Sequence, residues 1–227
     1  MTKLDYKNQY KQQVEKNLKL VLKDLGKKDM NEKISNWANK FNYSFEVIKQ
    51  KIVNDEIFRC VFIKEPGKQS FHERIAAEYI KTLDEVIDFE KLPNVGKKAI
   101  YLTNGKIFKG SDLSKKSKET KSIDFSWKTG KFIIYATHKY TGIDGSGGGQ
   151  DNQYEDVQKF IKNAVDCNEK NCVFLAICDG DYYQRKDSQT GDETKLKRLE
   201  RLTDNKTVFV KTIDELNLFL KNLVLSA

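Results

Sequence analysis

Two chemically active side chains lie near the ends of neighbouring predicted strands. Asp124 belongs to the alternating segment 122–127, and Lys139 lies near the end of the apolar segment 131–140. The Thr-Gly turn between these segments predicts antiparallel neighbours. A lysine in an apolar strand requires a partner, because burying an unpaired ammonium is costly. An aspartate beside it can hold Mg²⁺ and a water against a phosphate, and the metal lowers the pKa of that water.

The elements that must position this pair alternate along the chain. Apolar spacing predicts helices over about 1–55 and 71–86, and a further helix after the glycine-rich stretch 142–149. Asn104-Gly105 predicts a hairpin within 98–110. The other predicted elements are strands at 57–63, 122–127, 131–140, 172–178 and 207–211, a basic helix at 194–202, and a last helix with a Thr212/Glu215 capping box. We therefore expect an α/β fold, with a mixed central sheet flanked by helices.

The order helix, three strands, helix, strand, with Asp124 and Lys139 on adjacent strands, resembles the PD-(D/E)xK nucleases over about 70–178. The resemblance implies the restriction-endonuclease-like αβββαβ core and Mg²⁺-dependent hydrolysis of phosphodiesters in double-stranded DNA. The segment FHERIAAEYI resembles the first core helix of that family, which often carries a metal-binding carboxylate, and Glu73 takes that place. The implied catalytic set is Asp124, Lys139 and Glu73.

Two positions depart from the family pattern. Ile123 stands where the family has Pro, and Thr137 stands where it has Asp or Glu, two residues before the lysine. A hydroxyl is a weak substitute for a charged oxygen at a metal. The second carboxylate could be Glu73, or it could come from the start of the following helix, where Glu155 is the first choice beside Asp151 and Asp156. The implied metal ligands are therefore Asp124, Glu73 and Glu155, and the acids at the helix start could equally serve only to stabilise that helix.

Candidate DNA contacts follow the two core strands. Amides pair with adenine in the major groove, so the loop 141–154 could read bases. The resemblance to restriction endonucleases implies an A/T-only palindromic site, with which these amides are compatible. A second segment, 179–202, mixes tyrosines, an amide and basic residues, which suit phosphate and base contacts. The candidates are Ser146, Gln150, Asn152, Gln153, Tyr183, Gln184, Arg185 and Lys186. Either segment could instead be an ordinary solvated loop.

The composition of the chain limits the classes of function that it can have. The chain has 227 residues and a formal charge of +8, which favours a polyanionic partner. Its two histidines leave little room for most zinc hydrolases, and its four cysteines lack CxxC spacing. No apolar run approaches the roughly 20 residues of a membrane span. A polar start and cysteines expected to be reduced predict a cytoplasmic protein.

The N-terminal part leaves the function open. We expect a helical region at 1–56, for dimerisation or DNA contact, ahead of a nuclease core at 57–227. Residues 34–53 resemble a helix-turn-helix, with Ala38, then Asn42 at the turn, then Ile48. The leading hypothesis is a type II restriction endonuclease that acts as a homodimer on a palindromic site. The alternatives are a structure-selective nuclease of the junction-resolvase type and a non-enzymatic helix-turn-helix regulator.

Overall fold

The computed structural model describes residues 4–66, 70–112, 120–142, 149–186 and 191–226. The chain divides into two compact units: residues 5–72, and residues 73–226 together with Leu4. The division lies after residue 72, whereas the sequence placed it after residue 56. Within the described ranges, no helix combines the length and the apolar character needed to cross a bilayer.

The first unit is helical. It contains α1 (Tyr6–Asp24), α2 (Lys28–Phe41), α3 (Phe45–Asn54) and α4 (Glu56–Arg59). The turn between α2 and α3 is made by Asn42, which adopts the left-handed conformation with φ of 57°. The two helices and the turn expected in this segment are therefore present. Its core is built from Val21, Ile34, Ala38, Ile48, Ile52 and Phe62.

The strand predicted at 57–63 is wrong, because this segment begins as α4 and continues in turns. Asp55 starts the helix by accepting a hydrogen bond from the Phe58 backbone N–H at 2.9 Å. Phe58 and Phe62 are spaced four residues apart, and both pack against Trp37. A helical turn presents both rings to Trp37, and this packing outweighs the β-propensity of the apolar run.

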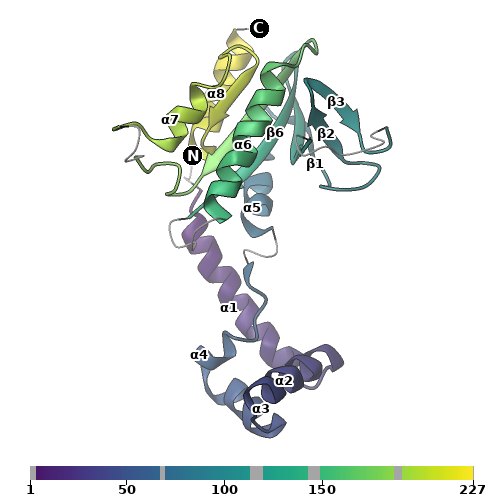
Figure 1. The fold of residues 1–227 in the computed structure, drawn as a ribbon, viewed down its shortest axis with the longest axis vertical. Helices are drawn as coiled ribbons and strands as arrows, with labels where there is room; N and C mark the ends of the chain where they lie inside the picture. The colour runs from purple at the N-terminus through teal and green to yellow at the C-terminus, as the bar shows by residue number, and fades with distance from the viewer. Residues whose placement is uncertain (1–3, 67–69, 113–119, 143–148, 187–190, 227) are drawn as a thin grey trace. The chain divides into compact units, whose positions relative to one another are not determined.

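A mixed five-stranded sheet forms the centre of the second unit (Figure 1). Its strands are β1 (Ile87–Lys91), β5 (Phe125–Thr129), β6 (Phe132–Tyr140), β7 (Cys172–Asp179) and β8 (Val208–Lys211), in the order β1-β5-β6-β7-β8. The first three strands pair antiparallel, and β6-β7 and β7-β8 pair parallel. The expected α/β architecture with a mixed central sheet is confirmed.

The remaining strands form a separate three-stranded sheet, in the order β3-β2-β4. They are β2 (Ile100–Thr103), β3 (Lys106–Lys109) and β4 (Lys121–Ser122). Asn104 and Gly105 both have positive φ, so the predicted hairpin is present. This small sheet lies between β1 and β5 in the chain, so the hairpin is an insertion and not a pair of central strands.

Helices join and cover the central sheet. They are α5 (Phe71–Ile80), α6 (Gly149–Val165), α7 (Lys195–Glu200) and α8 (Ile213–Leu225). The helix predicted over 71–86 stops at Ile80, and the strand β1, which the sequence analysis missed, follows it. Figure 1 shows α6 lying along β6 on one face of the sheet.

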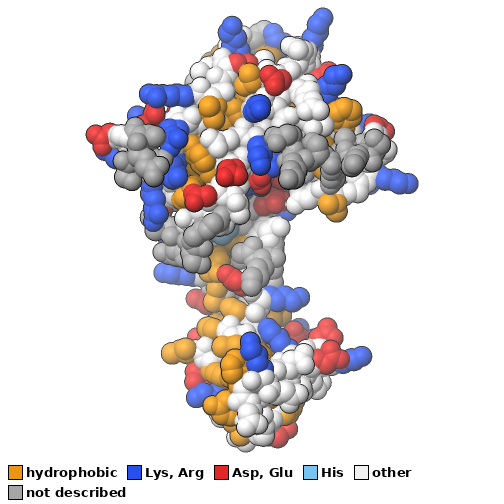
Figure 2. Space-filling view, viewed as in Figure 1, with side chains coloured by type: hydrophobic (Ala, Val, Ile, Leu, Met, Phe, Trp, Pro, Cys, Tyr) orange, Lys and Arg blue, Asp and Glu red, His pale blue; other side chains and the backbone are white. Residues whose placement is uncertain are grey.

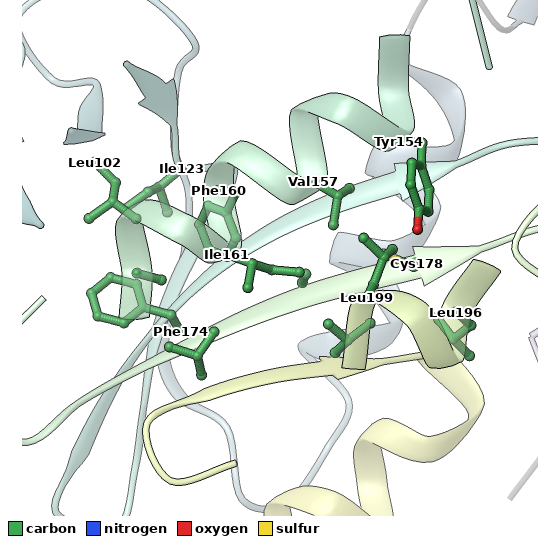
Figure 3. Packing of buried hydrophobic residues seen from close by; sticks show 14 of the residues in the cluster. Leu102, Ile123, Tyr154, Val157, Phe160, Ile161, Phe174, Cys178, Leu196 and Leu199 are labelled. Atoms are coloured by element: carbon green, nitrogen blue, oxygen red, sulfur yellow. The ribbon is translucent and has the colours of Figure 1, made fainter. Parts of the chain in front are cut away.

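Close packing fixes α6 on this face (Figure 3). Val157, Phe160 and Ile161 are essentially inaccessible to solvent and belong to the same core cluster as Phe174 on β7. Each such side chain stabilises the fold by about 1.5–3 kcal/mol on burial. Because α6 follows β6 and leads to the parallel strand β7, it begins near the carboxyl end of β6, where Lys139 lies.

Candidate active site

Asp124 is held between two strands immediately before β5. Its backbone N–H donates to the Ala136 carbonyl at 2.9 Å, and its own carbonyl accepts from the Leu92 N–H at 2.9 Å. The side-chain oxygen Oδ2 accepts from the Thr137 hydroxyl at 2.9 Å and from the His138 N–H at 2.8 Å. Asp124 is only 4% exposed. The carboxylate therefore has a fixed position beside Thr137 and His138 of β6.

Lys139 lies on the same face of the sheet as this carboxylate. Alternate residues of a strand share a face, so Thr137 and Lys139 point the same way, and Thr137 contacts Asp124 directly. The pKa of Asp124 is raised because burial disfavours its charge, and the nearby positive charge of Lys139 opposes that shift. The structure thus brings Asp124 and Lys139 together on one face of the sheet.

Glu73, near the start of α5, is the acid whose charge bears on Asp124. Its negative charge contributes to raising the Asp124 pKa. The Glu73 side chain is 18% exposed, and its Oε1 lies 2.9 Å from the Nζ of Lys91. Lys91 closes β1 and was not singled out from the sequence, because that strand was not recognised. The alternating segment Ile87–Lys91 was the available signal.

The acids at the start of α6 are engaged elsewhere or exposed. Asp156 forms an ion pair with Lys121, and Asp151 Oδ1 accepts a hydrogen bond from the Tyr182 hydroxyl at 2.6 Å. Glu155 is exposed, and no contact links it to Asp124. Figure 2 shows acidic side chains gathered around the lower end of α6. Of the two alternatives for the second carboxylate, the described residues therefore bring Glu73, and not Glu155, into the electrostatic environment of Asp124.

Thr137 has a role other than metal ligation in this arrangement. Its hydroxyl donates to Asp124, so it orients the carboxylate and does not replace the missing acid. Behind it, His138 points to the opposite face, where its Nε2 lies 3.2 Å from Asp179 Oδ2. Asp179 Oδ1 also accepts from the first amide of α8 at 2.9 Å. This buried pair supports the back of the sheet and leaves the Lys139 face to the candidate site.

The donor set fits a hard cation. No described residue donates a hydrogen bond to the Oδ1 atom of Asp124, so this oxygen keeps its lone pairs. The described residues contain no group of three or more His, Cys, Asp or Glu side chains suited to a metal. Mg²⁺ is commonly held by one or two carboxylates while it keeps several waters. Asp124 offers one such carboxylate, and Glu73 is an acid whose charge acts on it.

The predicted DNA contacts in loop 141–154 divide into two groups. Gln150 donates to the Gly142 carbonyl at 2.6 Å, and Gln153 accepts from the Thr141 hydroxyl at 2.7 Å. These two amides therefore stabilise the start of α6. Asn152 is exposed, and Ser146 lies outside the described residues.

The second predicted contact segment requires one correction. Tyr183 is completely buried against the core, so its side chain cannot contact DNA in this conformation. Hydrophobic packing next to Tyr182 outweighs the polar sequence context that suggested exposure. Gln184, Arg185 and Lys186 are exposed as expected, and Lys186 forms an ion pair with Asp192.

No family model matches the chain, and no curated protein matches it. Among solved structures, it is similar to the crystal structure of protein VC1899 from Vibrio cholerae, with a TM-score of 0.35 and 11% sequence identity. The alignment covers 96% of this chain and 55% of that one, so the chain spans about half the length of its structural neighbour. Similarity at this level assigns neither a fold family nor a function.

Proposed function

We propose that the protein is a Mg²⁺-dependent type II restriction endonuclease of the PD-(D/E)xK superfamily. The observation that carries the proposal is that Asp124 and Lys139 share one face of the central sheet, and that the charges of Lys139 and Glu73 both act on the Asp124 carboxylate. The element order supports it, because α5-β1-β5-β6-α6-β7 matches a helix, three antiparallel strands, a crossover helix and a parallel strand. The β2-β3-β4 sheet is then an insertion into that core.

The proposed reaction is hydrolysis of one phosphodiester per DNA strand. Mg²⁺ would supply a water of lowered pKa and neutralise charge on the phosphate. Asp124 and Glu73 would bind the ion through carboxylate oxygens. Thr137 and the His138 N–H hold Asp124 in one orientation, which lowers the cost of ordering it on binding. Lys139 would orient the attacking water and stabilise the charge that develops on the phosphoryl oxygens.

The surface supports a DNA partner. The chain carries a formal charge of +8, and Arg185, Gln184 and Asn152 are exposed on the segments that follow β7 and β6. Positive charge supplies the sequence-independent part of DNA affinity, and exposed amides can read base edges. A palindromic site would require two copies of the chain related by a two-fold axis. We therefore propose a cytoplasmic homodimer in which each subunit faces one half-site.

The direct test is digestion of a long natural DNA with the full chain and Mg²⁺. Discrete bands are the expected result. A smear would indicate a non-specific nuclease, and cutting restricted to branched DNA would indicate a structure-selective nuclease. Lys139→Ala should lower the cleavage rate at least about a hundredfold while leaving DNA binding in Ca²⁺ nearly unchanged. Lys128→Ala, which removes an exposed lysine on β5, is the matched control and should cleave normally.

A second candidate rests on the first unit. The α2–α3 pair has the left-handed Asn42 and the small Ala38 in the spacing of a DNA-binding helix-turn-helix. A regulator built on that unit would not need Asp124 or Lys139. Specific DNA binding with no cleavage, and binding unchanged in the Asp124→Ala/Lys139→Ala double variant, would favour this second function over the first.

A further inference from the structure

We propose that Lys195, the first residue of α7, binds DNA, and that its ammonium group contacts a backbone phosphate of the substrate. The inference rests on the proposed function, because it adds a substrate contact on the sheet face that carries the candidate site. The sequence of the segment 179–202 indicates phosphate contacts without ranking its basic residues. The packing around Lys195 distinguishes this lysine from the others.

The backbone around Lys195 is fixed to the segment that follows β7. The Lys195 N–H donates to the Arg185 carbonyl at 3.0 Å, and the Leu196 N–H donates to the Tyr183 carbonyl at 2.9 Å. The Leu196 side chain is buried in the same core cluster as Tyr183. Lys195 therefore has a defined place beside Arg185, an exposed residue that is itself a predicted DNA contact.

This segment lies at the end of the sheet that carries Lys139. The Tyr182 N–H donates at 3.1 Å to the carbonyl of Thr141, two residues after Lys139. Lys139 pairs in register with Cys178 of the parallel strand β7, so the two side chains project from the same face of the sheet. Cys178 and Tyr154 of α6 belong to one core cluster (Figure 3). Tyr154 therefore packs on the face of the sheet that carries Lys139.

Two tyrosine rings hold the Lys195 side chain on this face. The Lys195 Nζ lies 4.6 Å from the ring centroid of Tyr182 and 5.1 Å from that of Tyr154, and the two rings are in edge contact. The Tyr182 hydroxyl donates to Asp151 of α6 at 2.6 Å, which fixes the position of its ring. An ammonium group already held by two rings loses little further freedom when it binds an anion, and this favours affinity.

The Lys195 ammonium group is available to an anion. A lysine has several N–H donors, and attraction to aromatic rings does not use them in conventional hydrogen bonds. Among the residues that the structure describes, Lys195 forms no ion pair, whereas Lys186 is paired with Asp192. The proposed function brings a phosphodiester to this face of the sheet. The expected ligand of Lys195 is therefore a phosphate of the DNA backbone.

The experiment measures binding of a mixed-sequence fluorescent DNA duplex by the full chain in CaCl₂, as anisotropy over a series of NaCl concentrations. Loss of one phosphate contact reduces the slope of log affinity against log salt concentration by about 0.9. We expect Lys195→Gln to show this smaller slope and to bind about tenfold more weakly than the wild type. Lys195→Arg should keep the wild-type slope, because arginine keeps the charge and also stacks on aromatic rings.

Lys197→Gln is the matched control. Lys197 is exposed on the same helix, and two residues along a helix place it on the opposite side from Lys195. The two substitutions change the net charge by the same amount, so Lys197→Gln should keep the wild-type slope. Thermal unfolding of both variants tests whether either substitution acts through the fold. Equal melting temperatures are expected, because a partly exposed cation–π contact contributes little to stability.

The outcomes separate this inference from the proposed function. If Lys195→Gln binds like the wild type, loses affinity without a change in slope, or loses no more than Lys197→Gln, the inference is overturned. Discrete cleavage of a long natural DNA by the wild type in Mg²⁺ would still support the proposed function in each of these cases. If Lys195→Gln alone shows the smaller slope but the wild type cleaves no DNA, the phosphate contact stands and the nuclease function is refuted. A wild type that binds no DNA overturns both.

Discussion

Replacing Asp124 by Asn should inactivate the protein while making it more stable. The side chain is 4% exposed, and burial raises its pKa despite the opposing charge of Lys139. A raised pKa means that the folded state holds the carboxylate at a cost. Asn is nearly isosteric and keeps an oxygen that accepts from the Thr137 hydroxyl and the His138 N–H. The substitution therefore removes the buried charge and leaves its hydrogen bonds in place.

The size of the stabilisation by Asp124→Asn, and its dependence on pH, follow from the raised pKa of Asp124. Removing a charge that a functional site holds at a cost commonly adds about 1 kcal/mol to the free energy of unfolding. For a chain of this size that corresponds to about 2–4 °C in melting temperature. The raised pKa fixes the sign: the contribution of Asp124 to stability is greatest below the ordinary Asp value of 3.8 and falls as pH rises through the folded-state pKa. The advantage of Asp124→Asn should therefore be largest at neutral pH and disappear in acid.

Thermal unfolding at about pH 7.5 and about pH 3.5 tests this reasoning, because the contribution of Asp124 is greatest below the ordinary Asp value of 3.8 and is lost as the pH rises. Asp88→Asn, at an exposed position, is the control and should change stability little at either pH. Adding Mg²⁺ should reverse the order at neutral pH, because only the wild type keeps the full ligand set and ligand binding stabilises the folded state. A lower melting temperature for Asp124→Asn at neutral pH would refute the claim that the carboxylate is held at a cost.

Three further substitutions test the framework around the site. Thr137→Val should lower the free energy of unfolding by about 1 kcal/mol and slow cleavage, because Asp124 loses a hydrogen bond, and Thr137→Ser should restore both in urea titrations and single-turnover assays. Asp179→Ala should cost about 2–3 kcal/mol, since it removes the hydrogen-bond acceptor of the first amide of α8 and a contact of the buried His138 imidazole, while cleavage per folded molecule stays constant. Gly180→Ala should cost more than about 2 kcal/mol, because its Cβ would lie 2.3 Å from a backbone carbonyl oxygen that follows β6. Gly26→Ala, also at positive φ but in open space, should cost less in the same urea titrations.

Local signals predicted the elements that depend on neighbouring residues. Asn104-Gly105 specifies its own turn, and the left-handed Asn42 ends α2 where the sequence placed a turn. Asp124 and Lys139 could be paired because one tight turn joins their strands, so their proximity follows from sequence separation alone. In each of these cases the necessary partner is encoded within a few residues of the turn.

The elements that were missed or misassigned depend on distant partners. Strand β1 is short and mostly exposed, so its apolar alternation is weak, and it exists because β5 hydrogen-bonds to it. The run 57–63 has strand-like composition, but Phe58 and Phe62 find Trp37, a long way back in the chain, by forming helical turns. Without β1 in place, the ion pair between Lys91 and Glu73 could not be predicted.

The opposite charges of Asp124 and Lys139 also bear on how metal and substrate would bind together. Because Lys139 already offsets the charge of Asp124, a cation entering alone replaces an existing favourable interaction and gains only the difference. A DNA phosphate entering with the cation supplies new negative charge, with which the Lys139 ammonium group can pair. Under the proposed function, metal and DNA therefore bind with positive coupling, and the coupling acts equally on both affinities. Such an arrangement would keep the site poorly loaded with metal until a phosphodiester is present.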